Sequence, residues 1–204
     1  MPNWCSNSIT IQGSTDTIKP LWEEATREGS GLLNAIKPMP EALRATTSPT
    51  PIEGQAGYKG PQPKIDGCTN WHEWALKNWG CKWDIDPSEG LEFTDNGDGT
   101  AQISGWFQSP WSPPIEAYDT FIQDMDGCSL IADYHEEGMD FAGIYDNGDD
   151  QFMDGLGEWC EAVVKGTCSL EDTPKLFQTL DEEFELVENA RDYIEEQIAE
   201  QEAV

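Results

Sequence analysis

The chain is organised around one aromatic-rich stretch, Trp71-His72-Glu73-Trp74-Ala75-Leu76-Lys77-Asn78-Trp79-Gly80-Cys81-Lys82-Trp83-Asp84. It holds four of the nine tryptophans of the chain. The near-helical spacing from Trp71 to Trp79 predicts a helix that ends at Gly80, with an extended piece at Trp83. Because a tryptophan buries about 150–250 Å² of surface, we expect the other elements to pack on this stretch. The pattern predicts a core and indicates no chemistry.

The segments on either side of this stretch alternate between strand and helix patterns. Ile9 and Ile11 alternate with polar residues, which predicts a half-buried strand. The Asn-Gly and Asp-Gly pairs of residues 95–99 predict a hairpin turn between two strands. Strands are expected within 3–13, 91–94, 101–107, 129–135 and 140–145, and helices within 15–29 and 115–122. This order predicts an α+β fold in which an antiparallel sheet carries helices on one face.

Two further segments have a different character. Residues 44–67 are rich in proline and glycine, which predicts an irregular insertion, either functional or merely tolerated at the surface. Residues 156–204 are expected to form an acidic helical tail, with one long helix over about 174–200. Its apolar residues recur at steps of three and four, which fits a helix laid along the domain or a self-association helix; they are Phe177, Leu180, Phe184, Val187, Ile194 and Ile198.

The composition is strongly acidic. The 204 residues include 40 Asp and Glu against 11 Lys and Arg, for a formal net charge of −29. From residue 115 onward there are 26 acidic and 3 basic residues, whereas residues 1–114 hold 14 and 8. Such an excess repels nucleic acid and anionic membranes and favours a basic partner or bound cations. Plain solubility is the alternative explanation.

The cysteine pattern and the hydropathy favour a cytoplasmic protein. No two of the six cysteines form a CxxC pair, so we expect reduced, mostly buried thiols. The opening residues do not resemble a secretory leader, and no apolar run approaches the ~20 residues of a membrane span. With only two histidines a zinc site is not expected, and no cofactor is predicted.

Several motifs in one order resemble the YubB-type ferredoxin-like domain family of plasmid and bacteriophage proteins. They are Met1-Pro2-Asn3-Trp4-Cys5-Ser6-Asn7, Lys37-Pro38-Met39-Pro40, Asn78-Trp79-Gly80-Cys81-Lys82-Trp83-Asp84, Ser109-Pro110-Trp111-Ser112-Pro113-Pro114, and Tyr134-His135-Glu136-Glu137-Gly138-Met139-Asp140-Phe141-Ala142-Gly143. Cys81 stands where the family usually has Thr. The resemblance covers about residues 1–150, implies a ferredoxin-like domain over 1–155, and brings no catalytic residues.

Catalysis and metal binding have weaker signals. Glu73, Asp84, His135, Glu136, Glu137 and Asp140 are the candidate acid–base or metal-binding groups. Asp95 and Asp98 offer oxygen ligands for calcium, but the twelfth position of that loop is Trp106 and not Glu. No nucleophile elbow, P-loop, dinucleotide fingerprint or HExxH motif is present, so we expect a protein that is not an enzyme.

The leading hypothesis is therefore a DNA mimic or anti-defence inhibitor that binds a basic host protein, without binding nucleic acid or membrane. Carboxylates along a helix and loops would take the place of phosphates in a basic groove. The expected partner-binding residues are Asp146, Asp149, Asp150, Asp154, Glu158, Glu161, Asp181, Glu182, Glu185, Glu188, Asp192, Glu195 and Glu196. The alternatives are a phage assembly protein that forms a homodimer through residues 174–200, and a metal-dependent enzyme.

Overall fold

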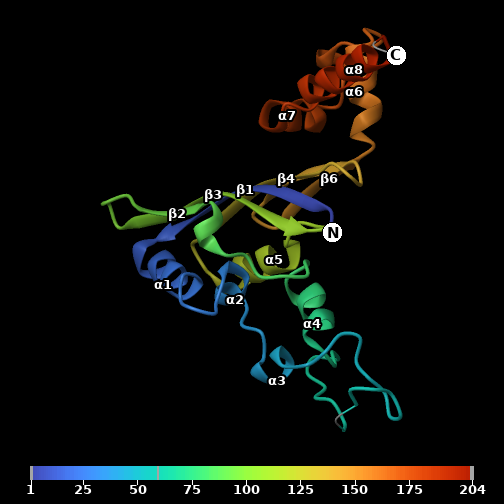
Figure 1. Cartoon of the computed structure of the whole chain (residues 1–204). Coiled ribbons are helices and arrows are strands. Elements are labelled where there is room, and N and C mark those ends of the chain that lie inside the picture. The colour runs from blue at the N-terminus through green and yellow to red at the C-terminus, as the bar shows by residue number, and fades with distance from the viewer. Residues whose placement is uncertain (1, 59, 203–204) are drawn as a thin grey trace.

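A six-stranded antiparallel sheet forms the centre of the molecule (Figure 1). The computed structural model describes residues 2–58 and 60–202, with side chains through residue 199. The strand order is β2-β3-β1-β4-β5-β6. The strands are β1 (Trp4–Ser14), β2 (Leu91–Asp95), β3 (Thr100–Pro110), β4 (Ser129–Glu136), β5 (Phe141–Asp146) and β6 (Asp149–Asp154). The predicted α+β class and the hairpin between β2 and β3 are confirmed.

The helices lie on both sides of the sheet (Figure 1). On one side are α1 (Thr15–Ala25), α2 (Leu32–Ile36), α4 (Trp71–Asn78) and α5 (Ile115–Asp124), with α3 (Glu41–Arg44) farther out. On the other side are α6 (Leu156–Val164), α7 (Lys175–Phe184) and α8 (Leu186–Glu202). Short 3₁₀ turns span Pro87–Glu89 and Leu170–Asp172. From β1 to β4, with α2–α4 inserted, the main elements succeed one another as β-α-β-β-α-β. The ferredoxin-like prediction depends on this succession and stays a prediction.

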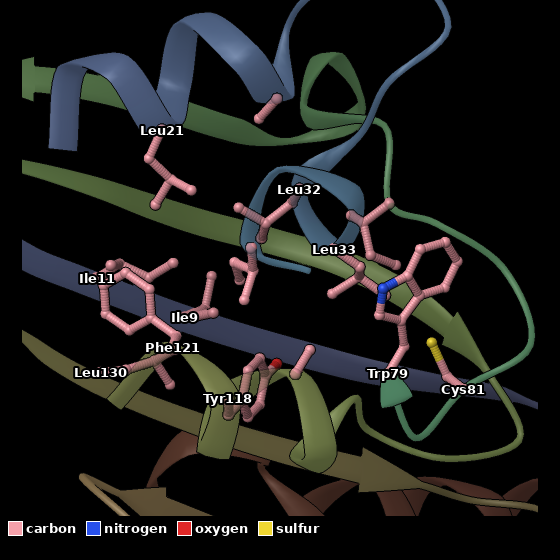
Figure 2. Packing of buried hydrophobic residues seen from close by; sticks show 14 of the residues in the cluster. Ile9, Ile11, Leu21, Leu32, Leu33, Trp79, Cys81, Tyr118, Phe121 and Leu130 are labelled. Carbon is pink, nitrogen blue, oxygen red and sulfur yellow. The ribbon is translucent and has the colours of Figure 1, made fainter. Parts of the chain in front are cut away.

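The main core lies between the sheet and the first group of helices. The alternation in β1 buries Ile9 and Ile11 on the helix side, as predicted. Figure 2 shows them beside Leu21 of α1 and Phe121 of α5, with α2 close by. Because side chains alternate across a strand, Ser6, Ser8, Thr10 and Gln12 point to the opposite face of the sheet, whereas the polar Asn7 is buried on the same face as Ile9 and Ile11. That second face is where the C-terminal helices pack.

The aromatic stretch forms the predicted helix but only part of the predicted core. Asn70 caps α4 by accepting from the backbone N–H groups of His72 and Glu73, both at 3.0 Å. Trp74 and Trp79 are buried with their rings edge to face, 5.4 Å apart. Trp83, in contrast, is 39% exposed, because it lies in the loop after Gly80 and packs against the partly exposed Trp4. The main core is therefore centred on the sheet, and α4 lies at its margin.

The prediction of a single helix over residues 174–200 is wrong. The chain breaks at Glu185, which adopts a left-handed conformation with φ +53°, and α8 then turns back to pack on α6. Asp181 accepts a hydrogen bond from the backbone N–H of Val187 at 2.8 Å, which supports the turn. Phe177 and Leu180 are fully buried in a second hydrophobic cluster. Much of the apolar pattern that could have served a homodimer is therefore used within the chain.

The second hydrophobic cluster joins the C-terminal helices to the sheet. It combines Leu156 and Cys160 of α6 with Phe177 and Leu180 of α7 and with Ala142 of β5. Helix α7 lies across β4, β5 and β6. Helix α6 begins directly after Gly155, and the predicted division into domains at 155/156 stays a prediction. The predicted acidic tail is thus helical and packs on the second face of the sheet.

The insertion at 44–67 is irregular, as its composition indicates. An isolated β-bridge joins Ile65, near the end of the insertion, to Cys68, just beyond it. Lys59 lies outside the described residues.

All six cysteines are free thiols, and burial raises the pKa of Cys5 and of Cys81 to about 12. Both therefore stay protonated at neutral pH.

Phe177→Ala should destabilise the protein by about 3–5 kcal/mol, since the fully buried ring joins the C-terminal helices to the sheet. Urea denaturation followed by tryptophan fluorescence measures the change. Thr179→Ala, at an exposed position of the same helix, is the matched control and should cost little. Equal stability of the two variants would show that α7 does not contribute to the folded core.

Candidate functional site

The predicted partner-binding carboxylates lie on the hairpin of β5 and β6 and on the C-terminal helices. We call residues 146–202 the acidic unit. Asp146 ends β5, and Asp149, Asp150 and Asp154 belong to β6. The other positions are Glu158 and Glu161 on α6, Asp181 and Glu182 on α7, Glu185 at the break, and Glu188, Asp192, Glu195 and Glu196 on α8. All are exposed except the half-buried Asp181.

Four of these carboxylates accept hydrogen bonds from non-ionic groups. Asp146 and Asp149 accept from the nearby side chains of Asn147 and Gln151, and the other two have partners farther along the chain. Asp150 accepts a hydrogen bond from the Tyr134 hydroxyl at 2.7 Å, and burial raises its pKa. Asp181 accepts the Val187 N–H that fixes the break between α7 and α8. These two groups stabilise the fold, which reduces their freedom to meet a partner. The sequence had no signal that separated them from their solvated neighbours.

Two of the three basic residues of the acidic unit form local ion pairs with described residues, and the third, Lys175, approaches the side-chain oxygen of Gln178. Lys165 pairs with Glu161 one turn earlier on α6. Arg191 approaches Glu188 on α8, with 3.4 Å between nitrogen and oxygen. Exposed pairs of this kind contribute about 0–1 kcal/mol. Seven predicted carboxylates have no ion pair or side-chain hydrogen bond to any described residue: Asp154, Glu158, Glu182, Glu185, Asp192, Glu195 and Glu196.

The candidate catalytic residues are dispersed, and several support the backbone. Glu73 accepts from the backbone N–H of Thr69 at 2.8 Å, which lowers its pKa. Asp84 accepts from Leu33 and Ile85 at 2.8 and 2.9 Å, while burial raises its pKa. Among the described residues there is no group of three or more side chains placed to hold a metal ion.

The acidic turn after β4 is split between the two faces of the sheet. Glu136 is buried and accepts the backbone N–H groups of Gly138 and Met139 at 3.1 and 2.6 Å. His135, one residue earlier, points to the second face. Asp140 accepts from the backbone N–H of Gly157 at 2.9 Å, at the start of α6. Of the four groups predicted as a possible acid–base or metal cluster, Glu136 therefore holds the turn, whereas His135, Glu137 and Asp140 line one groove.

Asp95 and Asp98, the candidate calcium ligands, lie in and beside the turn between β2 and β3. Asp95 accepts from the backbone N–H of Gly97 at 2.9 Å. Asp98 accepts from the N–H and the hydroxyl of Thr100 at 3.0 and 2.6 Å. The two carboxylates thus stabilise the tight turn between β2 and β3.

A groove lies between α6, α8 and the turn after β4. Its volume is about 680 Å³, and its lining includes His135, Asp140, Leu156, Ala190 and Tyr193. Sequence reasoning missed it because its walls come from segments far apart in the chain. Burial lowers the pKa of His135, although Glu137, Glu136 and Asp140 oppose this, so burial favours the neutral imidazole. We call this hollow the α6–α8 groove.

An exposed aromatic surface at the start of β1 was also not predicted. Trp4 packs against Trp83 with ring centres 6.0 Å apart, and Lys82 Nζ lies 4.5 Å from the centre of the Trp83 ring.

No described helix is both long enough and apolar enough to cross a bilayer.

Asp133 and Glu183 bring two carboxylates together beneath α7. Burial, and then the charge of Glu183, raises the pKa of Asp133 to about 6. The native state therefore holds this proton more tightly than the unfolded chain. The corresponding stability is present at low pH and is lost as the pH rises through about 6.

Asp133→Asn should make the protein more stable than the parent above pH 6, by about 1 kcal/mol after allowance for solvent screening. Below about pH 3 the two proteins should be equally stable, because Asp133 is then neutral in both the native and the unfolded state. Denaturation at a series of pH values measures the difference, with the exposed Glu182→Gln as control. A difference independent of pH would contradict the assigned cause.

Comparisons with known proteins give little further identification. No family model matches the chain, and no curated protein matches it. A crystal structure of protein api92 from Yersinia pseudotuberculosis, described with the family model DUF1281, resembles it with a TM-score of 0.31 and 20% identity. The match covers 44% of this chain and 32% of that one. A likeness of this size carries no argument about fold or function.

Proposed function

We propose that this protein is not an enzyme and that it binds a basic host protein by imitating a polyanion such as DNA. The observation that carries the proposal is the number of carboxylates in the acidic unit that have no side-chain partner among the described residues. Seven predicted carboxylates remain without side-chain partners among the described residues, and Lys165 and Arg191 are already paired. Such a surface attracts a positively charged partner over the Debye length of about 8–10 Å and weakens with salt.

The charge spacing on α8 supports mimicry. Glu188, Asp192, Glu195 and Glu196 lie within about 12 Å of helix axis, at about 1.5 Å per residue. Arg191 lies among them and offsets one of the four negative charges. This segment of α8 therefore carries about one net negative charge per 4 Å of helix axis. One strand of duplex DNA carries about one charge per 3.4 Å. A basic groove that binds phosphates would therefore meet a similar charge density on this helix.

The proposed setting follows from the resemblance to YubB-type proteins of plasmids and bacteriophages. A mobile element benefits when it blocks a host nuclease, a restriction enzyme or another DNA-binding defence protein. The proposal therefore places the protein in the cytoplasm of a host bacterium, as an anti-defence inhibitor. The ferredoxin-like domain would serve as the scaffold that presents the acidic unit.

Neutralising α8 should weaken binding to a DNA-binding polycation. Protamine bound to labelled duplex DNA provides the assay, since the protein should displace the DNA at low salt and lose this ability as salt is added. The variant Glu188→Gln, Asp192→Asn, Glu195→Gln, Glu196→Gln should need about ten-fold more protein, or roughly 1.4 kcal/mol.

The control variant removes four exposed carboxylates from the first half of the chain, by Gln substitution of Glu23, Glu28, Glu53 and Glu89. Both variants change the net charge equally. Retained displacement by the control supports a binding surface on α8. Equal losses would show that only the total charge matters, as expected for a merely solubilising charge.

A further inference from the structure

The α6–α8 groove combines an apolar floor with an acidic rim. Leu156 and Leu186 are buried at its base, and Ala190 lies beside them on α8. Tyr193 forms part of the wall and is 63% exposed, which is high for an aromatic side chain in a hollow. A surface of this kind is suited to an inserted apolar side chain, because desolvating it is favourable.

The rim carries only negative formal charge. Glu137 and Asp140 come from the turn after β4, and Glu161 comes from α6. Among the described residues, no lysine or arginine belongs to the lining, although Lys165 pairs with Glu161 from outside. Burial lowers the pKa of His135 and favours its neutral form. The groove therefore favours a cationic occupant and disfavours an anionic one.

The size of the groove restricts the occupant further. Its volume of about 680 Å³ lies within the range of about 300–1,000 Å³ that is usual for ligand pockets. A few side chains fit, but a whole domain does not. An amphipathic segment offers both features that the groove requires, namely apolar anchors for the floor and basic groups for the rim.

We infer that the α6–α8 groove binds a cationic amphipathic segment of the basic partner. An apolar side chain of that segment enters between α6 and α8, and its flanking lysine or arginine groups meet Glu137 and Asp140. This inference rests on the proposed function and adds to it the place where the partner is gripped. The exposed carboxylates of α8 then guide the approach, and the groove supplies a short-range contact that survives moderate salt.

The first test compares two labelled helical peptides on the full-length protein by fluorescence anisotropy. One peptide alternates leucine and lysine on an amphipathic pattern, and the other has glutamine at each leucine position and the same charge. The leucine–lysine peptide should bind at least about ten-fold more tightly, and part of its affinity should persist as salt is raised. Equal affinities for the two peptides would overturn the inference.

The second test uses substitutions in the groove. Tyr193→Ala should weaken the leucine–lysine peptide about ten-fold, while Ile52→Ala, at a similarly exposed apolar residue (65%), should not. Glu137→Lys should weaken the peptide more than Asp124→Lys, a charge reversal at an exposed position on α5. Circular dichroism confirms that each variant is folded.

The two proposals fail in distinguishable ways. If the protein displaces DNA from protamine but Tyr193→Ala and Glu137→Lys bind the peptide as the parent does, the groove is not the contact and polyanion mimicry stands. If the parent protein does not compete for protamine at low salt, the proposed function itself fails. Peptide binding that is lost in Tyr193→Ala would then still place an amphipathic ligand in the groove.

Discussion

The burial of Phe177 and Leu180 against the second face of the sheet is the interaction on which the C-terminal half depends. This half carries 26 acidic and 3 basic residues from position 115 onward, so its parts repel one another. Apolar burial opposes that repulsion, because α7 lies across β4, β5 and β6 while α8 packs on α6. The sheet is consequently covered on both sides by helices that pack through their apolar faces, and the C-terminal group is the more acidic one outside.

Local patterns predicted the elements of the sheet well, because strand alternation and tight turns are encoded within a few residues. Ile9 and Ile11 marked one face of β1, and the Asn-Gly and Asp-Gly pairs marked the turn between β2 and β3. The tail was mispredicted for a physical reason. Apolar steps of three and four fit one long helix as well as two shorter helices, and the break falls at Glu185, which is not a usual helix-ending residue.

The site was less accessible from sequence than the fold. Acidic residues could be identified, but their roles depend on neighbours that lie far away in the chain. Asp150 is bonded to Tyr134 and Asp181 to the backbone of Val187, whereas Glu195 has no such partner among the described residues. The α6–α8 groove is assembled from a strand end, a turn and two helices, so no local pattern indicates it.

Asp140 connects the turn after β4 to the beginning of α6 in two ways. Its carbonyl oxygen accepts from the backbone N–H of Gly155 at 2.9 Å, and its carboxylate accepts from that of Gly157, also at 2.9 Å. The two bonds hold the start of α6 against the turn that joins β4 to β5. Because Asp140 also lines the α6–α8 groove, one residue both fixes the first turn of α6 and contributes to the wall of that groove.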